Sequence, residues 1–353
     1  MGVEILPDTQ TYELSLSPDY VSAWGFWEAV RELLQNSIDQ CTVNRASKTV
    51  FDYDEANESL TIGTTNCRLE PRTLLLGVSG KRDDSRAIGQ FGEGYKLALL
   101  VLTRLSYEVR IANGPTLWTP RFCHSDKYNE HVLTIDVEPR EDTGPSGVHF
   151  TIRDVDPKTH ERIHENYLMD VPVNTILEED YLRGRVFVRG LFVCDFSELH
   201  YGYNFSPDRI KLDRDRGMAS QWEVAYEASR LWCESGNVEA LYECMATGAL
   251  DTQHVNIPRQ ESNVYVVERY LRENPDCIPI ASEADAKYYR GAKTRLVPKP
   301  LRDLLHRMHE FVFNHEGTPS ERLEAWHNRY GSSLGAEAKR DWEKLLAESK
   351  QWA

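Results

Sequence analysis

The sequence predicts an α+β protein in which helices cover one face of a mixed, mostly antiparallel sheet. Two observations lead to this class. The first 155 residues run in the order helix, hairpin, loop, helix and then a meander of short alternating segments. The chain also has 353 residues, of which 41% are hydrophobic. That is enough for a buried core and for two or three domains.

The elements of the first domain, residues 1–155, follow from local patterns. Residues 11–16 alternate like a strand, and Ser17 and Pro18 have the types of an N-cap and a first helical residue, so a helix is expected over 18–41. Further along we expect a hairpin at 48–53 and 59–62, a loop at 63–88 with a short helix at 71–76, a glycine loop at 89–94, a helix at 95–104 and strands at 105–112, 117–122, 131–137 and 147–153.

Two further domains are expected, at 156–253 and 254–353. A shift in composition at 154–165 indicates a linker, after which a strand at 185–194 and a long helix at 219–246 stand out. The C-terminal region predicts a small α/β and helical module. Its elements are expected at 264–272 (helix), 278–281 (strand), 283–290 (helix), 295–298 (strand) and 300–308 (helix), before a charged helical end.

Composition argues against several classes of function. The net charge of −15 disfavours nonspecific binding to nucleic acid, which needs a basic face. No apolar run has the length of a membrane span, and the N-terminus lacks a secretory signal pattern, so no membrane association is expected. The seven cysteines are scattered without a CxxC pair, which predicts reduced thiols in a cytoplasmic protein. The scattered histidines, among them His160, His164 and His306, are expected at the surface.

A polar stripe runs along the first helix. Glu32, Asn36 and Asp39 stand at positions i, i+4 and i+7 and so share one face. The apolar face is formed by Trp27, Val30, Leu34 and Cys41. A plain solvated face would also show polar residues at this spacing. The acid–amide–acid composition without lysine favours a binding role, because a carboxylate can polarise water and an amide oxygen can complete a magnesium shell beside phosphate oxygens.

A glycine loop precedes the second helix. Gly89, Gly92 and Gly94 are followed by Lys96 in the pattern G-x-x-G-x-G-x-K. Glycines let a backbone approach a ligand closely, and a helix N-terminus offers amide groups and partial positive charge to an anion. The alternative is a tight loop–helix joint without a ligand.

Together, RELLQNSID and IGQFGEGYKLALL resemble the N-box and second glycine box of the GHKL, or Bergerat-fold, ATPases. That superfamily includes gyrase-type topoisomerases, ninety-kilodalton heat-shock chaperones, histidine kinases, MutL and the MORC proteins, and the motif text is most similar to the chaperone and MORC branch. The resemblance covers about 10–153 and, more weakly, 166–250. It implies a two-layer α/β sandwich that binds ATP and Mg²⁺, followed by a transducer-like domain.

By position, the resemblance implies a role for each motif residue. Glu32 would be the general base at the γ-phosphate, Asn36 the magnesium ligand and Asp39 an acid near the nucleotide. Ser146, in GPSGVHFTI, would support the adenine site. The whole second glycine box is expected at the nucleotide: Gly89, Gln90, Phe91, Gly92, Glu93, Gly94, Tyr95 and Lys96.

The first glycine box departs from the family pattern. The family has Asp-x-Gly-x-Gly, whose Asp receives the adenine amino group, but this chain has Thr64, Asn66 and Arg68 at those positions. Threonine can accept the same hydrogen bond without charge, and a charge-assisted bond is stronger than a neutral one. Thr64, with Asn66 or a water, is therefore expected at the adenine, with lower affinity or altered base selectivity.

The segment LDRDRG in the second domain resembles the loop by which the chaperone middle domain sends an arginine to the γ-phosphate. Arg216 aligns best and Arg214 is the alternate. An arginine there would stabilise transition-state charge, whereas the alternative is a solvated turn. The preceding stretch, GRVFVRGLFV, is consistent with a central strand of a transducer domain.

Three functions are compatible with these motifs. The first is an ATPase that acts as a conformational clamp, with residues 1–16 as a dimerising strap. The second is a nucleotide-gated interaction module with little turnover, whose protein partner would dock on 255–353. The third, a histidine-kinase-like phosphotransferase, is disfavoured because no sensor span and no helix with a phospho-accepting histidine precede the ATP-binding segment.

Overall fold

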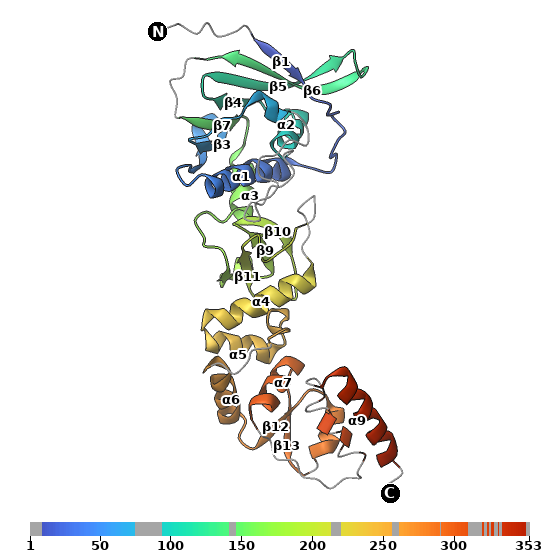
Figure 1. Cartoon of the computed structure of the whole chain (residues 1–353). Helices are drawn as coiled ribbons and strands as arrows, with labels where there is room; N and C mark the ends of the chain where they lie inside the picture. Colours follow the sequence, from blue (N-terminus) through green and yellow to red (C-terminus); the bar gives the residue numbers. More distant parts are fainter. Residues whose placement is uncertain are drawn as a thin grey trace. The chain divides into compact units, whose positions relative to one another are not determined.

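The computed structural model of this protein describes residues 9–74, 94–140, 146–212, 220–255, 261–289, 291–309, 320, 323–324, 326–327, 331 and 334–350. The chain is α+β, as expected, and divides into two compact units (Figure 1). The first comprises Met1–Val171 and Arg189–Phe192, and the second comprises Pro172–Val188 and Val193–Ala353. The three domains expected from the sequence, with boundaries near 155 and 253, stay a prediction.

A seven-stranded sheet organises the first unit. Its order is β1-β6-β5-β4-β7-β3-β2, and every pair whose register is defined is antiparallel. The strands are β1 (Gln10–Glu13), β2 (Thr49–Asp54), β3 (Ser59–Thr65), β4 (Val109–Asn113), β5 (Thr116–Ser125), β6 (Glu130–Pro139) and β7 (Gly147–Ile152). The expected hairpin is therefore confirmed, and β4, β5 and β6 form a meander as expected. The last strand departs from that meander, because β7 pairs with β4 and β3 and not with β6.

Two helices, α1 (Phe26–Val43) and α2 (Gly94–Arg104), pack on each other and on this sheet (Figure 1). The hydrophobic core lies between these two helices and the sheet. Leu60 and Ile62 of β3 are fully buried in it, whereas Thr61 between them is only partly buried, as the alternation of a strand requires. Two short 3-10 turns belong to the same unit: η1 (Glu55–Asn57) connects β2 and β3, and η2 (Pro71–Leu74) follows β3 in the chain.

The expected start of the first helix at Pro18 is wrong, because α1 begins at Phe26. The preceding segment turns instead, with Val21 at a positive φ of 50°. Its backbone carbonyls are bound by one guanidinium: Arg104 of α2 donates to the carbonyl oxygens of Pro18, Tyr20, Val21 and Trp24. These carbonyls therefore obtain hydrogen bonds without forming a helix.

The expected linker at 154–165 is also wrong, because it contains helix α3 (Pro157–Asn166). Asp156 caps it by accepting from the backbone N–H of Thr159, and proline stands at the first helical position. Ile163 is buried in the core of the first unit. His160 stacks on Tyr53, with ring centroids 3.9 Å apart, so this histidine is partly covered.

A four-stranded sheet forms the start of the second unit, in the order β10-β9-β11-β8. Its strands are β8 (Thr175–Leu177), β9 (Arg185–Val188), β10 (Leu191–Asp195) and β11 (Gly202–Phe205), and η3 (Asp180–Leu182) precedes β9. The single strand expected at 185–194 is wrong, because Arg189 and Gly190 have positive φ angles of 53° and 78°. Two such residues form the tight turn of a hairpin.

The single helix expected at 219–246 is also wrong, because this segment forms two helices, α4 (Gln221–Ser235) and α5 (Val238–Thr247). Gly236 ends α4 with a φ of 69°, and Asn237 caps α5 through the backbone N–H of Ala240. The remaining elements are η4 (Leu250–Thr252), α6 (Glu261–Glu273), β12 (Cys277–Ile280), η5 (Glu283–Tyr289), β13 (Lys293–Leu296), α7 (Lys299–Met308) and α9 (Ala336–Ser349). The expected alternation in the C-terminal region is confirmed, with a 3-10 helix at η5.

The seven cysteines are all free. None of the helices within the described ranges is long and apolar enough to span a membrane. The expected exposure of His306 is wrong: its ring is buried, and its Nε2 lies 2.8 Å from the carbonyl oxygen of Pro279.

Candidate functional site

The polar stripe of α1 lies largely inside the first unit rather than on its surface. Glu32 is 2% exposed and Asp39 is fully buried, while Asn36 is half-buried. A guanidinium nitrogen of Arg31 lies 3.7 Å from the Glu32 carboxylate. The amide nitrogen of Asn36 donates to the backbone carbonyl of Glu32 at 2.7 Å. A solvated face would not bury two carboxylates, so the alternative raised by the sequence is wrong for this stripe.

The last residue of the glycine loop touches this stripe. Gly94 is the first residue of α2, and a Cβ atom added there would lie 2.2 Å from the Oε2 of Glu32 and 3.3 Å from the Nδ2 of Asn36. A side chain at this position would therefore displace the Glu32 carboxylate from the place where it now lies. The structure brings together the end of one sequence motif and two residues of the other.

Asp39 has a different neighbour. Its Oδ1 lies 3.9 Å from a guanidinium nitrogen of Arg189, at the turn between β9 and β10. The same nitrogen donates to the hydroxyl of Thr42 at 2.5 Å. The buried Asp39 carboxylate thus lies near a cation.

Lys96 and Tyr95 both bind η2. The ammonium of Lys96, which is fully buried, donates to the carbonyl oxygen of Thr73 at 2.9 Å. The hydroxyl of Tyr95 lies 2.9 Å from that of Thr73, and burial raises the pKa of Tyr95 to about 12. The ammonium that was expected at the phosphates thus binds the backbone just before residue 75.

Thr64 takes part in a short hydroxyl relay. Its Oγ1 donates to the Oγ of Ser37 at 2.8 Å, and Ser37 donates to the carbonyl oxygen of Gly63 at 2.6 Å. The direction is determined, because a carbonyl can only accept. The Thr64 hydroxyl has therefore used its hydrogen and can offer only lone pairs to another group.

Asn66 and Ser146 lie at the same end of the sheet as Thr64. Asn66 has a positive φ of 54°, and its backbone N–H donates to the carbonyl oxygen of Ser146 at 3.1 Å. Its side chain donates to the carbonyl oxygen of Ala46 at 2.8 Å. The structure thus brings together the three residues expected near the adenine.

Asn113 binds the backbone of Leu69, in the segment that follows Asn66 in the chain. Its side-chain amide accepts from the N–H of Leu69 at 3.0 Å and donates to the carbonyl oxygen of Leu69 at 2.8 Å. The guanidinium of Arg68, which stands at a glycine position of the family pattern, lies against Gly114, where a Cβ would meet its Nε at 2.7 Å. These contacts define the backbone path after Asn66.

No protein-family model matches this chain, and no curated protein matches it.

Several predicted site residues lie outside the described residues. They are Gly89, Gln90, Phe91, Gly92, Glu93, Arg214 and Arg216. Their roles stay predictions.

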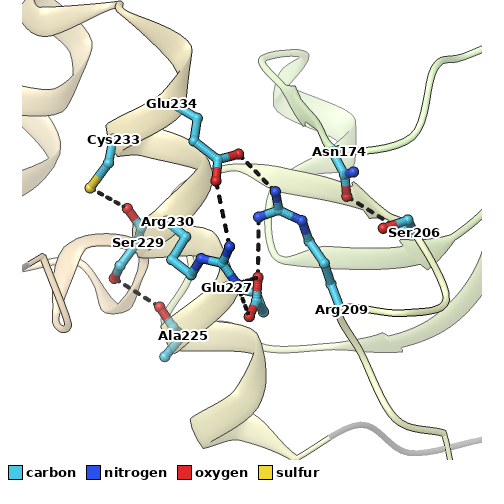
Figure 2. Close-up of polar contacts among 9 residues, drawn as sticks. All are labelled: Asn174, Ser206, Arg209, Ala225, Glu227, Ser229, Arg230, Cys233 and Glu234. Carbon is cyan, nitrogen blue, oxygen red and sulfur yellow. Dashed lines mark hydrogen bonds and ion pairs between the residues drawn. The ribbon is translucent and has the colours of Figure 1, made fainter.

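The segment ahead of the predicted arginine loop is held by a charge network on α4 (Figure 2). Arg209 donates to Glu227 at 3.1 Å and to Glu234 at 2.8 Å, and Arg230 donates to Glu227 at 2.9 Å. The Glu227 side chain is only 9% exposed, so two guanidiniums compensate one nearly buried carboxylate. Nearby, the side chain of Asn174 accepts from the backbone N–H of Ser206.

Sequence reasoning missed Ser37, Asn113 and Arg189. Ser37 had a readable signal, because it lies between Leu34 and Cys41 at the spacing of the apolar stripe, where a hydroxyl needs a partner. The other two had none, since their partners lie far away in the sequence.

Proposed function

We propose that the first unit is a Bergerat-type nucleotide-binding domain of the GHKL class, which binds ATP with Mg²⁺ and hydrolyses it slowly. Hydrolysis would drive lid closure and a domain rearrangement or dimerisation through residues 1–16. The observation that carries the proposal is the contact of Gly94 with Glu32 and Asn36. It supports a single site built from the two motifs, which the sequence alone leaves separate.

The residues present fit a magnesium–phosphate group at this contact. The Asn36 amide directs its nitrogen to the helix backbone, and the oxygen is the atom that a magnesium ion uses. Within the described ranges, no group of three or more His, Cys, Asp or Glu side chains could hold a metal. An ion at Asn36 would therefore depend on phosphate oxygens and water for the rest of its shell, and would arrive with the nucleotide.

Thr64, which is expected near the adenine, can accept a hydrogen bond from an amino group. Thr64 has donated its hydrogen to Ser37, so its oxygen is an acceptor, and the exocyclic amino group of adenine is a donor. The bond would be neutral, which supports a modest affinity compared with a carboxylate.

In this proposal Glu32 acts as the general base that orients the attacking water. Its burial beside Gly94 supports a role at the phosphates rather than at the surface. The amides of 89–94 would contact the phosphates, and Arg216 would stabilise the charge that develops on transfer.

Calorimetry with Mg²⁺ tests binding. ATP, ADP and GTP are titrated into the wild-type chain and into Asn36→Ala. We expect ATP to bind and Asn36→Ala to weaken ATP at least about tenfold in the presence of Mg²⁺, with a smaller effect in EDTA. The absence of binding for all three nucleotides would overturn the proposal.

A second candidate is a nucleotide-gated interaction module without useful turnover. Two observations favour it: the neutral Thr64 at the adenine position, and the engagement of the Lys96 ammonium by the Thr73 carbonyl. Turnover of the wild type and of Glu32→Ala separates the two. Loss of a measurable wild-type rate in Glu32→Ala supports the ATPase, whereas ATP binding with no rate in either protein supports the module.

A further inference from the structure

Strand β13 forms one edge of the small parallel sheet in the second unit. It pairs with β12 from Cys277↔Lys293 to Ile280↔Leu296. In a parallel pair, the backbone groups of alternate residues point away from the partner strand. Within the described ranges, no strand pairs with the outer side of β13. The side chains of Lys293, Arg295 and Leu296 are all exposed, and that of Thr294 is partly exposed.

The opposite edge of the same sheet is protected. Ile278 and Ile280 of β12 are buried, and Pro279 between them has no backbone N–H. The ring of His306 in α7 donates to the carbonyl oxygen of Pro279 at 2.8 Å. Among the residues that the structure describes, the edge of this sheet without a partner is therefore that of β13.

The sequence around this edge is basic in an otherwise acidic chain, and Lys293 and Arg295 lie on β13 itself. The net charge of the whole sequence is −15, yet residues 287–302 contain no acidic residue. They contain Lys287, Arg290, Lys293, Arg295, Lys299 and Arg302. Because side chains alternate along a strand, Lys293 and Arg295 share one face of β13, and Thr294 and Leu296 share the other.

We propose that β13 binds an extended acidic segment of a partner protein by strand addition. The backbone of that segment would pair with the outer edge of β13, acidic side chains at alternate positions would face Lys293 and Arg295, and an apolar side chain between them would contact Leu296. Leu296 is 57% exposed and favours a peptide over a nucleic acid, whose phosphates would use only the cations. This interaction is independent of the proposed nucleotide site.

Lysine and arginine on an edge strand have another known use, because they prevent edge-to-edge aggregation. That role needs no partner. A test must therefore separate a surface that only repels other copies of the chain from one that binds an acidic strand.

The probe is a capped, fluorescently labelled eight-residue peptide in which glutamate and valine alternate, titrated into the full chain and followed by anisotropy. One control peptide has lysine in place of glutamate, and another has its four central amides N-methylated, which keeps the charge but removes the pairing donors. The test variant is Lys293→Glu/Arg295→Glu. Its matched control, Lys339→Glu/Arg340→Glu, makes the same charge change at exposed positions of α9.

We expect saturable binding of the acidic peptide that falls at least about tenfold in the β13 variant and in the N-methylated peptide, but not in the α9 variant. Equal binding of the N-methylated peptide, or displacement of the peptide by single-stranded DNA at equal concentration, would show a general polyanion surface and overturn the proposal. No binding of the acidic peptide would also overturn it, and self-association of the β13 variant would then identify a purely protective edge.

Discussion

The hydroxyl of Thr64 donates its hydrogen to Ser37, 2.8 Å away, and the Ser37 hydroxyl in turn donates to the Gly63 carbonyl. This relation links β3 to α1 and leaves Thr64 as an acceptor at the end of the sheet where Asn66 and Ser146 also lie. Because this direction of donation is fixed by the Gly63 carbonyl, the Thr64 oxygen can accept from a ligand but has no hydrogen left to donate.

The first prediction concerns base selectivity. Thr64→Val keeps the shape of the side chain but removes the acceptor, and should weaken ATP about fivefold, the effect of one neutral hydrogen bond. GTP, which carries a carbonyl at the corresponding ring position, should change by less than about twofold. Thr64→Ser is the control and should bind like the wild type. Calorimetry checks this, and an equal loss for both nucleotides would show that Thr64 acts through the fold.

The second prediction concerns Gly94. Gly94→Ala places a methyl group where Oε2 of Glu32 now lies, so the carboxylate has to move. We expect turnover of ATP to fall at least about tenfold while ATP affinity changes less than about threefold, because a displaced general base affects chemistry more than binding. Gly335→Ala is a matched control, since nothing lies within 4 Å of its added Cβ. Unchanged turnover in Gly94→Ala would separate this contact from catalysis.

The third prediction concerns the charge network of α4. Glu227→Ala leaves Arg209 and Arg230 without their shared carboxylate and should lower the free energy of unfolding by about 2 kcal/mol. Glu234→Ala is the control: its side chain is 48% exposed, and its loss should amount to less than about 0.5 kcal/mol. Urea unfolding followed by tryptophan fluorescence measures both. Equal losses would mean that burial does not decide the strength of these pairs.

The fourth prediction concerns pH. Burial, and secondly the nearby His164, lower the pKa of His160 below its ordinary value of 6.5, while Glu161 and Glu55 oppose the shift. Between the two pKa values the unfolded chain binds more protons than the folded chain, so stability is lost as pH falls below 6.5.

The measurement is the thermal midpoint between about pH 5.5 and about pH 7.5. Relative to the wild type, His160→Phe should lose less stability at the acidic end, because phenylalanine preserves the stacking on Tyr53 without titrating. His124→Gln, at a side chain that is 49% exposed, is the control and should follow the wild type. Parallel curves for all three proteins would contradict the assignment.

The sequence predicted those elements whose patterns are local. The hairpin of β2 and β3, the helix after the glycine loop and the meander of β4 to β6 follow from hydrophobic period and turn residues, and all are present. The strand β7 is also present, but its position between β4 and β3 was not expected. Two errors also had local signals: Asp156 before Pro157 is a helix start, and Gly236 before Asn237 is a helix break. In those two places the cap and breaker residues therefore suffice to define the helix ends.

Other errors had no local signal. The segment before α1 looks helical, yet its carbonyls bind Arg104 from another helix, and tertiary hydrogen bonds outweigh propensity. The turn at Arg189 is an intermediate case: Gly190 is a local turn signal inside the apolar run, but the positive φ of Arg189 is not visible in the sequence. The burial of His306 similarly depends on a carbonyl in β12.

The acid–amide stripe and the glycine loop are visible in the spacing of residues along the chain, so the sequence alone suggests the residues of the proposed nucleotide site. The contact of Gly94 with Glu32, the acceptor offered by Thr64 and the bond from Lys96 to Thr73 follow only from the folded chain. Helical and strand periods are set by the backbone over a few residues, whereas these contacts depend on how separate elements pack, which no local pattern records.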